Sequence, residues 1–133
     1  LRPEHGLSDR DRLLLEVASL LHDVGIYVSL KGHHKHSWYL LSVSEIFGLS
    51  RDDMAVISNI ARYHRRAAPN KSHLPYMALD SDARVVVNKL GAILRVANAL
   101  DDSLRPANRA NCEQRGRERS AGPVVSQRFR DPR

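Results

Sequence analysis

Apolar residues recur at helical spacing in four stretches of the chain, with polar or glycine-containing segments between them. This pattern predicts helices over about residues 8–22, 36–47, 50–64 and 80–104. Ser8 and Ser50 stand at the starts of the first and third stretches, where serine is a favoured N-cap. Residues 26–30 are predicted to form a short buried connector, and residues 67–80 a loop with two prolines. Helices joined by loops predict an all-α bundle.

The predicted core is aliphatic, because only 5% of the residues are aromatic while 42% are hydrophobic. Each helical stretch contributes one apolar face to that core. The side chains expected on these faces are Leu13, Leu14, Val17, Leu20 and Leu21; Leu40, Leu41, Val43 and Phe47; Met54, Ile57, Ile60 and Ala61; and Val86, Leu90, Ile93, Leu94, Ala97 and Leu100.

Composition changes after Leu104, and this divides the chain into two predicted parts. Residues 1–104 are expected to form one helical domain. Residues 105–133 hold eight Arg and three acidic residues, which is most of the net charge of +6, and no apolar period. We expect this Arg-rich tail to be disordered and able to bind nucleic acid without sequence specificity. The lone Cys112 excludes an internal disulfide framework and favours a reducing, cytoplasmic location, and no apolar run predicts a membrane span.

A His-Asp pair at the end of the first predicted helix is the leading candidate for metal chemistry. His22 and Asp23 are adjacent, while His36 and His64 are predicted near the ends of the second and third helices. Imidazole and carboxylate groups together suit divalent metals such as Mg, Mn, Fe or Zn. The sequence therefore predicts that three helix ends converge to place His22, Asp23, His36 and His64 in one pocket. The alternative is that these histidines cap helices or contact phosphate.

Basic residues gather around the same predicted helix ends. They are Lys31, His33, His34, Lys35, Arg65, Arg66 and Lys71. Arginine binds phosphate through planar bidentate contacts, and lysine supplies an adaptable point charge. These residues are therefore the predicted phosphate-binding set, and the alternative for Arg65 and Arg66 is that they only complement the negative end of a helix.

The segments LLHDVG, HHKHSWYLL, ISNIARYHRR, LPYMAL and KLGAILRVANALD, taken in order, resemble the C-terminal helical domain of the exopolyphosphatase/guanosine pentaphosphate phosphohydrolase (Ppx/GppA) family. That domain is related to the HD superfamily of phosphohydrolases, and the resemblance covers residues 1–104. It implies an accessory domain that holds polyphosphate or a guanosine polyphosphate and contributes to homodimer contacts. Hydrolysis in that family lies in a preceding pair of actin-like domains.

Two positions depart from the HD pattern. No helix carrying its first histidine precedes Ser8, and Asn98 stands where the pattern ends in Asp. A neutral amide removes an anionic ligand, so a metal site here would be a degenerate one. The resemblance leaves open whether the chain has activity of its own. The competing hypotheses are a metal-dependent phosphohydrolase acting on a nucleotide or phosphate ester, and a non-catalytic interaction module.

Overall fold

The computed structural model describes residues 6–65 and 67–104, and the regular elements in these ranges are helices. No strand occurs in these ranges, which confirms the predicted all-α class. The elements in chain order are α2 (Asp9–Leu21), the short 3₁₀ helix η1 (Val24–Tyr27), α3 (His33–Ser42), α4 (Arg51–Arg62), α5 (Leu74–Met77) and α6 (Ser81–Leu104). None of these helices is both long and apolar enough to cross a membrane. The predicted disorder of residues 105–133 lies outside the described residues.

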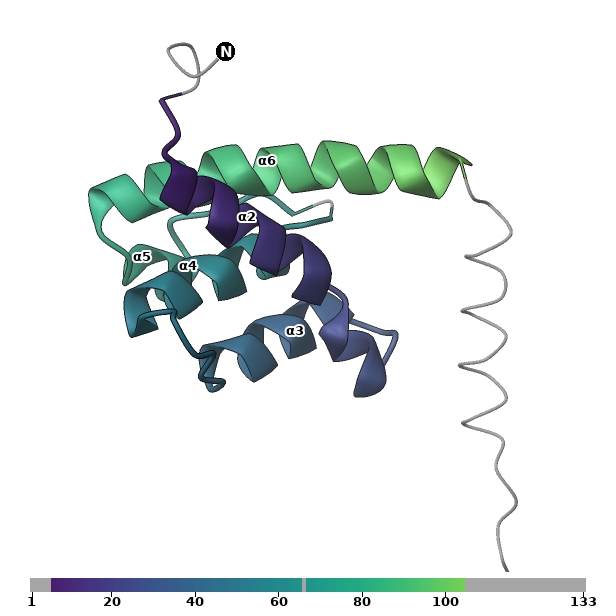
Figure 1. Ribbon diagram of the computed structural model, residues 1–133. Coiled ribbons are helices and arrows are strands. Elements are labelled where there is room, and N and C mark those ends of the chain that lie inside the picture. The colour runs from purple at the N-terminus through teal and green to yellow at the C-terminus, as the bar shows by residue number, and fades with distance from the viewer. Residues whose placement is uncertain (1–5, 66, 105–133) are drawn as a thin grey trace, which may run out of the picture.

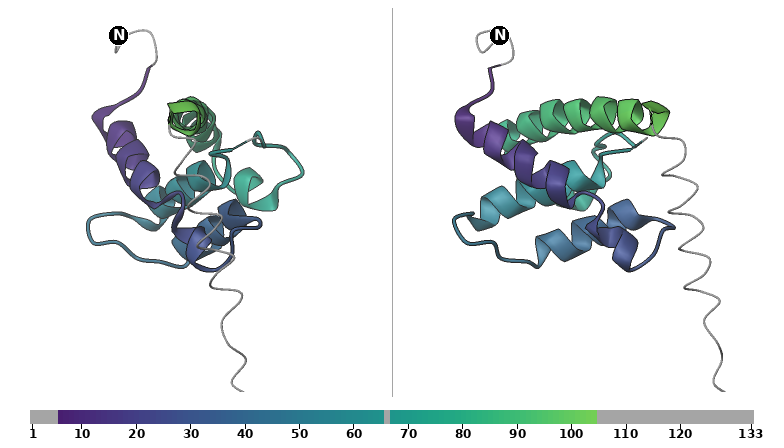
Figure 2. Two further views of the ribbon diagram at one scale, coloured as in Figure 1. Left: turned by 90° about the vertical axis from the view of Figure 1, so that its right-hand side faces the viewer. Right: turned by 45° about the vertical axis from the view of Figure 1, so that its right-hand side comes forward.

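Helix α4 is the centre of the bundle. It contacts α2, α3 and α6, with α6 on one side and α3 on the other (Figure 1). Two turned views keep α3 and η1 on the side of the bundle away from α6 (Figure 2). Ile57, Ile60 and Ala61 on α4 are fully buried, as are Ala18 on α2 and Val87 on α6. The ends of α2 and α4 and the start of α3 are thereby held close together.

Two helices begin with the same serine–aspartate motif. Ser8 and Ser50 each accept a hydrogen bond from the backbone N–H of the residue three positions on, and that Asp accepts one from the serine's own N–H. These reciprocal bonds satisfy backbone donors that the first turn leaves free, and they confirm both predicted N-caps. Asp53 also pairs with Arg10 of α2, so one carboxylate joins the starts of α2 and α4.

This pair predicts a specific pH dependence of stability. The hydrogen bond from Arg10 lowers the pKa of Asp53 from 3.8 to about 2. A depressed carboxyl pKa stabilises the fold above 3.8, and the stabilisation is lost as the pH falls toward 2. We therefore expect Arg10→Met to be less stable than wild type near neutral pH, with the difference shrinking as the pH falls from 3.8 to about 2.

Acid titration of the free energy of unfolding checks this expectation. Arg12→Met is the matched control, because Arg12 pairs with Glu16 while both side chains are largely exposed. Such exposed pairs contribute little to stability. A wild-type advantage over Arg10→Met that stays constant below pH 3.8 would contradict the assignment.

The predicted bounds of the second helix are wrong. Helix α3 begins at His33 and ends at Ser42, whereas the sequence predicted about residues 36–47. Gly32 begins it with a φ of 73°, a left-handed conformation that glycine adopts easily. It ends where the Ser42 and Ser44 hydroxyls donate to the carbonyls of Tyr39 and Leu40, respectively. Serine hydroxyls that bond back to helix carbonyls compete with continuation of the helix.

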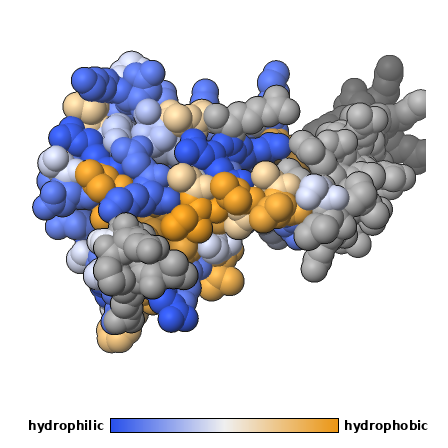
Figure 3. Space-filling model, turned by 90° about the horizontal axis from the view of Figure 1, so that it is seen from above, coloured by the Kyte–Doolittle hydropathy of each residue, from blue (hydrophilic) through white to orange (hydrophobic). Residues whose placement is uncertain are grey.

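Several residues predicted to be buried are exposed instead. The residues concerned are Leu13, Leu20, Val43, Phe47, Ile93, Ala97 and Leu100, together with Val28 and Leu30 of the predicted buried connector. The residues on α2 and α6 are exposed because these helices carry apolar side chains on more than one face, and α4 covers only one of them. The others lie in the connections on either side of α3. Seen from above, an apolar band crosses the surface along α6 (Figure 3).

Candidate metal and anion site

Three helix ends meet at one corner of the bundle. His22 follows the last residue of α2, His33 is the first residue of α3, and His64 lies two residues after α4. Gly25 in η1 is buried against the first turns of α3, and its N–H donates to the Ser37 hydroxyl at 2.9 Å. The segment between α2 and α3 is thereby pressed against α3, which brings the His-Asp pair toward α4.

Side chains from these ends form a cluster of three imidazoles and one carboxylate. His33 Nε2 lies 3.2 Å from His64 Nε2 and 3.3 Å from Asp23 Oδ1. His64 Nε2 lies 3.4 Å from the same oxygen, and His22 Nε2 lies 3.4 Å from Asp23 Oδ2. The His64 side chain is fully buried and the Asp23 side chain is 47% exposed. The cluster is therefore closed on the α4 side and reachable from the Asp23 side.

The other ring nitrogen of each histidine faces a backbone carbonyl. The Nδ1 atoms of His22, His33 and His64 lie 2.8, 3.1 and 2.5 Å from the carbonyl oxygens of the residues three positions earlier, Ser19, Leu30 and Ala61. A carbonyl oxygen only accepts, so each Nδ1 donates and carries the hydrogen. In the neutral imidazole, Nε2 is then the atom with the free lone pair. Carbonyls in the last turns of α2 and α4, together with the Leu30 carbonyl just before α3, thus fix the tautomers.

Burial and neighbouring groups set the charges in the cluster. Burial favours a higher pKa for the Asp23 carboxyl, but the nearby imidazoles of His64, His22 and His33 outweigh it, and the pKa is lowered. Burial lowers the pKa of His33, and it outweighs the Leu30 carbonyl and the Asp23 carboxylate, which both raise it. Asp23 is therefore ionised and His33 neutral at physiological pH, which are the states in which both groups bind metals.

Three of the four metal ligands predicted from sequence, His22, Asp23 and His64, lie together within 4.8 Å. The fourth position that we expected for His36 is taken by His33. This difference follows from the helix boundary, because starting α3 at His33 puts that residue, rather than His36, at the converging end. The three closely spaced histidines of HHKH signalled a ligand here, but the choice among them depended on the helix start. Asn98 lies on α6, partly buried.

A basic pocket of about 380 Å³ adjoins the cluster. Gly32, His34, Arg62, Arg65 and Ala67 line it. The Arg62 guanidinium lies 5.5 Å from the Trp38 ring and 5.9 Å from the Tyr63 ring. Stacking on aromatic faces holds a guanidinium in place while its N–H donors remain available. Burial lowers the pKa of His34, and repulsion from the neighbouring basic side chains acts in the same direction.

The predicted phosphate-binding residues are distributed around this pocket unevenly. His34 and Arg65 line it, and His33 belongs to the metal-type cluster. Lys31, Lys35 and Lys71 are exposed and outside the lining, and Arg66 lies outside the described residues. Arg62 lines the pocket as well, although the predicted phosphate-binding set did not contain it.

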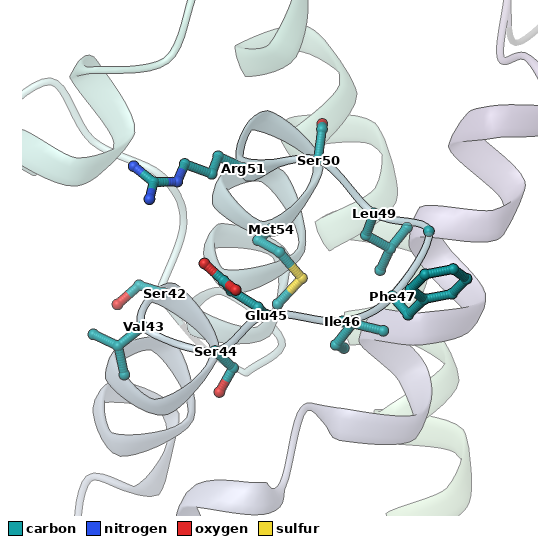
Figure 4. A pocket seen from close by; sticks show the side chains of 11 residues that line it. Ser42, Val43, Ser44, Glu45, Ile46, Phe47, Leu49, Ser50, Arg51 and Met54 are labelled. Carbon is teal, nitrogen blue, oxygen red and sulfur yellow. The ribbon is translucent and has the colours of Figure 1, made fainter.

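A second hollow, of about 660 Å³, lies in the connection between α3 and α4 (Figure 4). Glu45 and Met54 lie near its centre, and Phe47 lies at its edge (Figure 4). Its charged lining residues are one acid, Glu45, and one base, Arg51. This balance gives no net attraction for a polyanion, so the basic pocket is the better candidate for anion binding.

Comparison with known proteins places this chain beside a phosphatase family. A family model described as Ppx/GppA phosphatase, domain III, matches residues 3–121. A stretch of 52 residues is 38% identical to the guanosine-5'-triphosphate,3'-diphosphate pyrophosphatase of Pseudoalteromonas translucida (strain TAC 125). The stretch is 39% of this chain and 10% of that relative. The chain therefore aligns with a small part of the relative's length.

Proposed function

Because the chain belongs to the Ppx/GppA phosphatase domain III family, we propose that it is an accessory domain that binds polyphosphate or a guanosine polyphosphate. The family expected from the sequence is confirmed by the match over residues 3–121. The proposal gives this domain the task of holding a phosphorylated chain. It assigns cleavage of the phosphoanhydride bond to other domains of such phosphatases.

The observation that carries the proposal is the basic pocket beside the start of α3. Arg62 and Arg65 provide planar donors for phosphate oxygens, and His34 adds a third nitrogen-bearing side chain. Arg62 is already held by its two aromatic neighbours, so binding sacrifices little side-chain freedom there. The N-terminus of α3 adds partial positive charge at the same edge.

Contacts with other protein surfaces are a further part of the proposal. Ile93, Val96 and Leu100 on α6 are about half exposed or more, which is unusual for a run of large apolar side chains on one helix. They support a contact with an adjoining domain or with a second copy of the chain.

Binding of polyphosphate to the full chain tests the anion-holding role. We expect salt-sensitive binding by the wild type and a loss of about 100-fold in affinity when Arg62→Ala and Arg65→Ala are combined, because each charge-assisted phosphate contact contributes about 1.5 kcal/mol. Titration calorimetry at low and moderate salt measures both effects.

The control removes the same amount of charge elsewhere. The double variant Arg12→Ala with Arg51→Ala loses two exposed arginines that do not line the pocket. It should retain the wild-type affinity within a few-fold. Equal loss in both double variants would show that net charge alone binds the polyanion, and would contradict a built pocket.

The competing hypothesis of a metal-dependent phosphohydrolase requires a bound metal with a free coordination position. The imidazole–carboxylate cluster supports the first requirement, and the exposed side of Asp23 is compatible with the second. Hydrolysis of a phosphate ester by the isolated chain would favour it over the accessory role.

A further inference from the structure

We propose that Arg95 of α6 is a positioning residue of the basic pocket, because it holds the segment that follows α4 and thereby sets where Arg65 lies. This segment runs alongside α6 (Figure 1), and Arg95 Nη1 donates to the Ala67 carbonyl oxygen at 3.3 Å. Ala67 lines the pocket, whereas Arg95 does not. The inference rests on the proposed function, since it concerns anion binding at that pocket, and it adds α6 to the helices that build the pocket.

Arg65 is the pocket residue that most needs support from outside the pocket. Its side chain is exposed, and it makes no hydrogen bond or ion pair with the part of the chain that the structure describes. The Arg62 guanidinium, by contrast, lies 5.5 Å from the Trp38 ring and 5.9 Å from the Tyr63 ring. The position of Arg65 therefore depends on the backbone to which it is attached.

Two fixed points flank Arg65 along the chain. His64, directly before it, is 1% exposed, and its Nδ1 hydrogen is directed at the Ala61 carbonyl. Ala67, two residues after it, is itself exposed and is held by the bond from Arg95. Loss of that bond would leave the backbone at Arg65 fixed on one side only.

The far part of the same segment turns back to the end of α4. The Tyr63 hydroxyl lies 2.8 Å from His73 Nδ1, and the two rings are stacked with centroids 5.6 Å apart. The N–H groups of Ser72 and His73 both donate to Asn70, at 3.0 Å. These bonds hold residues 70–73 together and against Tyr63. None of them reaches the pocket side of the segment, which therefore depends on α6.

Helix α6 gives Arg95 a rigid base. Leu90 and Leu94 of this helix are 1% and 5% exposed, so its inner face is firmly packed. Gly91 lies against the end of α4, because a Cβ on it would be 3.9 Å from the Tyr63 Cβ. Arg95 follows Gly91 by four residues and so lies on the same face of the helix, one turn further on. Side chains on packed helices position a site more precisely than side chains on loops.

The bond from Arg95 acts before an anion arrives. A binding residue on a loose segment loses backbone and side-chain freedom when it engages its ligand, and that loss weakens binding. A segment that is already held in place has less freedom to lose. Arg95 therefore strengthens anion binding by ordering Arg65 in advance, without touching the phosphate.

Three variants of the full chain, titrated with sodium polyphosphate in a calorimeter, test the assignment. Arg95→Met removes the donor, and affinity should fall about fivefold, the ordinary net effect of one hydrogen bond on an equilibrium constant. Arg95→Lys keeps a charged donor on a long side chain and should recover most of that loss. Arg84→Met is the matched control, because Arg84 lies on the same helix beside Met77 and outside the pocket lining. It should bind within twofold of the wild type.

Hydrogen exchange without any anion measures the positioning itself. Arg95→Met should speed exchange across residues 67–73 several-fold relative to the wild type, while Arg95→Lys and Arg84→Met should not. The salt dependence of affinity gives a third readout, because its slope counts the cations that contact phosphate. The slope should be the same for Arg95→Met as for the wild type.

Each contrary result has a distinct meaning. Equal affinity of Arg95→Met and Arg84→Met, or unchanged exchange across residues 67–73 in Arg95→Met, would overturn the positioning role. A shallower salt slope in Arg95→Met would show that Arg95 contacts phosphate directly, which also overturns it. Absence of polyphosphate binding by the wild type would reject the proposed function instead, and the exchange result would still decide whether Arg95 holds the segment.

Discussion

Gly25→Ala is expected to destabilise the protein by about 3 kcal/mol, at the upper end of the usual cost of overpacking. A Cβ at this position would overlap the carbonyl oxygen of His33 and the backbone nitrogen of Ser37, and would lie 2.7 Å from the Ser37 hydroxyl. Two of these three neighbours are backbone atoms, which cannot turn aside as a side chain would. The whole of α3 would have to move away from η1.

The movement of α3 away from η1 in Gly25→Ala would also separate the His33 ring from Asp23. Thermal and denaturant unfolding measure the loss of stability, and Gly91→Ala is its matched control. A Cβ at Gly91 would meet only the Tyr63 Cβ, at an ordinary 3.9 Å. Since alanine is better than glycine inside a helix by roughly 0.5–1 kcal/mol, Gly91→Ala should be neutral or stabilising. Similar behaviour of the two variants would contradict the close approach of η1 to α3.

Ile57→Ala is the second substitution with a large expected effect. Ile57 is fully buried on α4, the helix that contacts α2, α3 and α6. Its truncation removes apolar contacts and leaves a cavity that rigid neighbours cannot fill, at a cost of about 3 kcal/mol. For a domain of this size, each kcal/mol corresponds to about 4–8 °C in Tm.

The control for this prediction uses the same chemical change on an exposed helix face. Ile93 on α6 is 45% exposed, so Ile93→Ala should cost well under half as much. Calorimetric unfolding of both variants measures the contrast. A smaller effect at Ile57 than at Ile93 would show that α4 is not the centre of the packing.

The starts of α2 and α4 were the most predictable part of this fold. The N-caps at Ser8 and Ser50 depend only on the serine hydroxyl and on an aspartate three residues later, so the sequence alone located both caps. The end of α3 was not predictable in this way. Leu40 to Phe47 has a helix-like apolar spacing, but Phe47 finds no described element to pack against and is fully exposed. Whether a side chain is buried depends on which other segments pack against it, and the periodicity of its own segment does not contain that information.

The candidate site also has a part that the sequence predicted and a part that it did not. Residue types and convergence of helix ends pointed to His22, Asp23 and His64, which the structure brings together. The choice between His33 and His36 depended on where α3 begins, and a shift of three residues changed the answer. The contact between Arg62 and Trp38 was not predictable from the sequence, because the two residues are far apart along the chain.

The stacking of Arg62 on Trp38 has a practical consequence. Trp38 is the single tryptophan of the chain, so all of the indole emission originates beside the basic pocket. A cation that sits over an indole ring perturbs the electrons of that ring, and a ligand that draws the cation away alters the perturbation. Tryptophan fluorescence can therefore report ligand binding at the basic pocket without an attached dye.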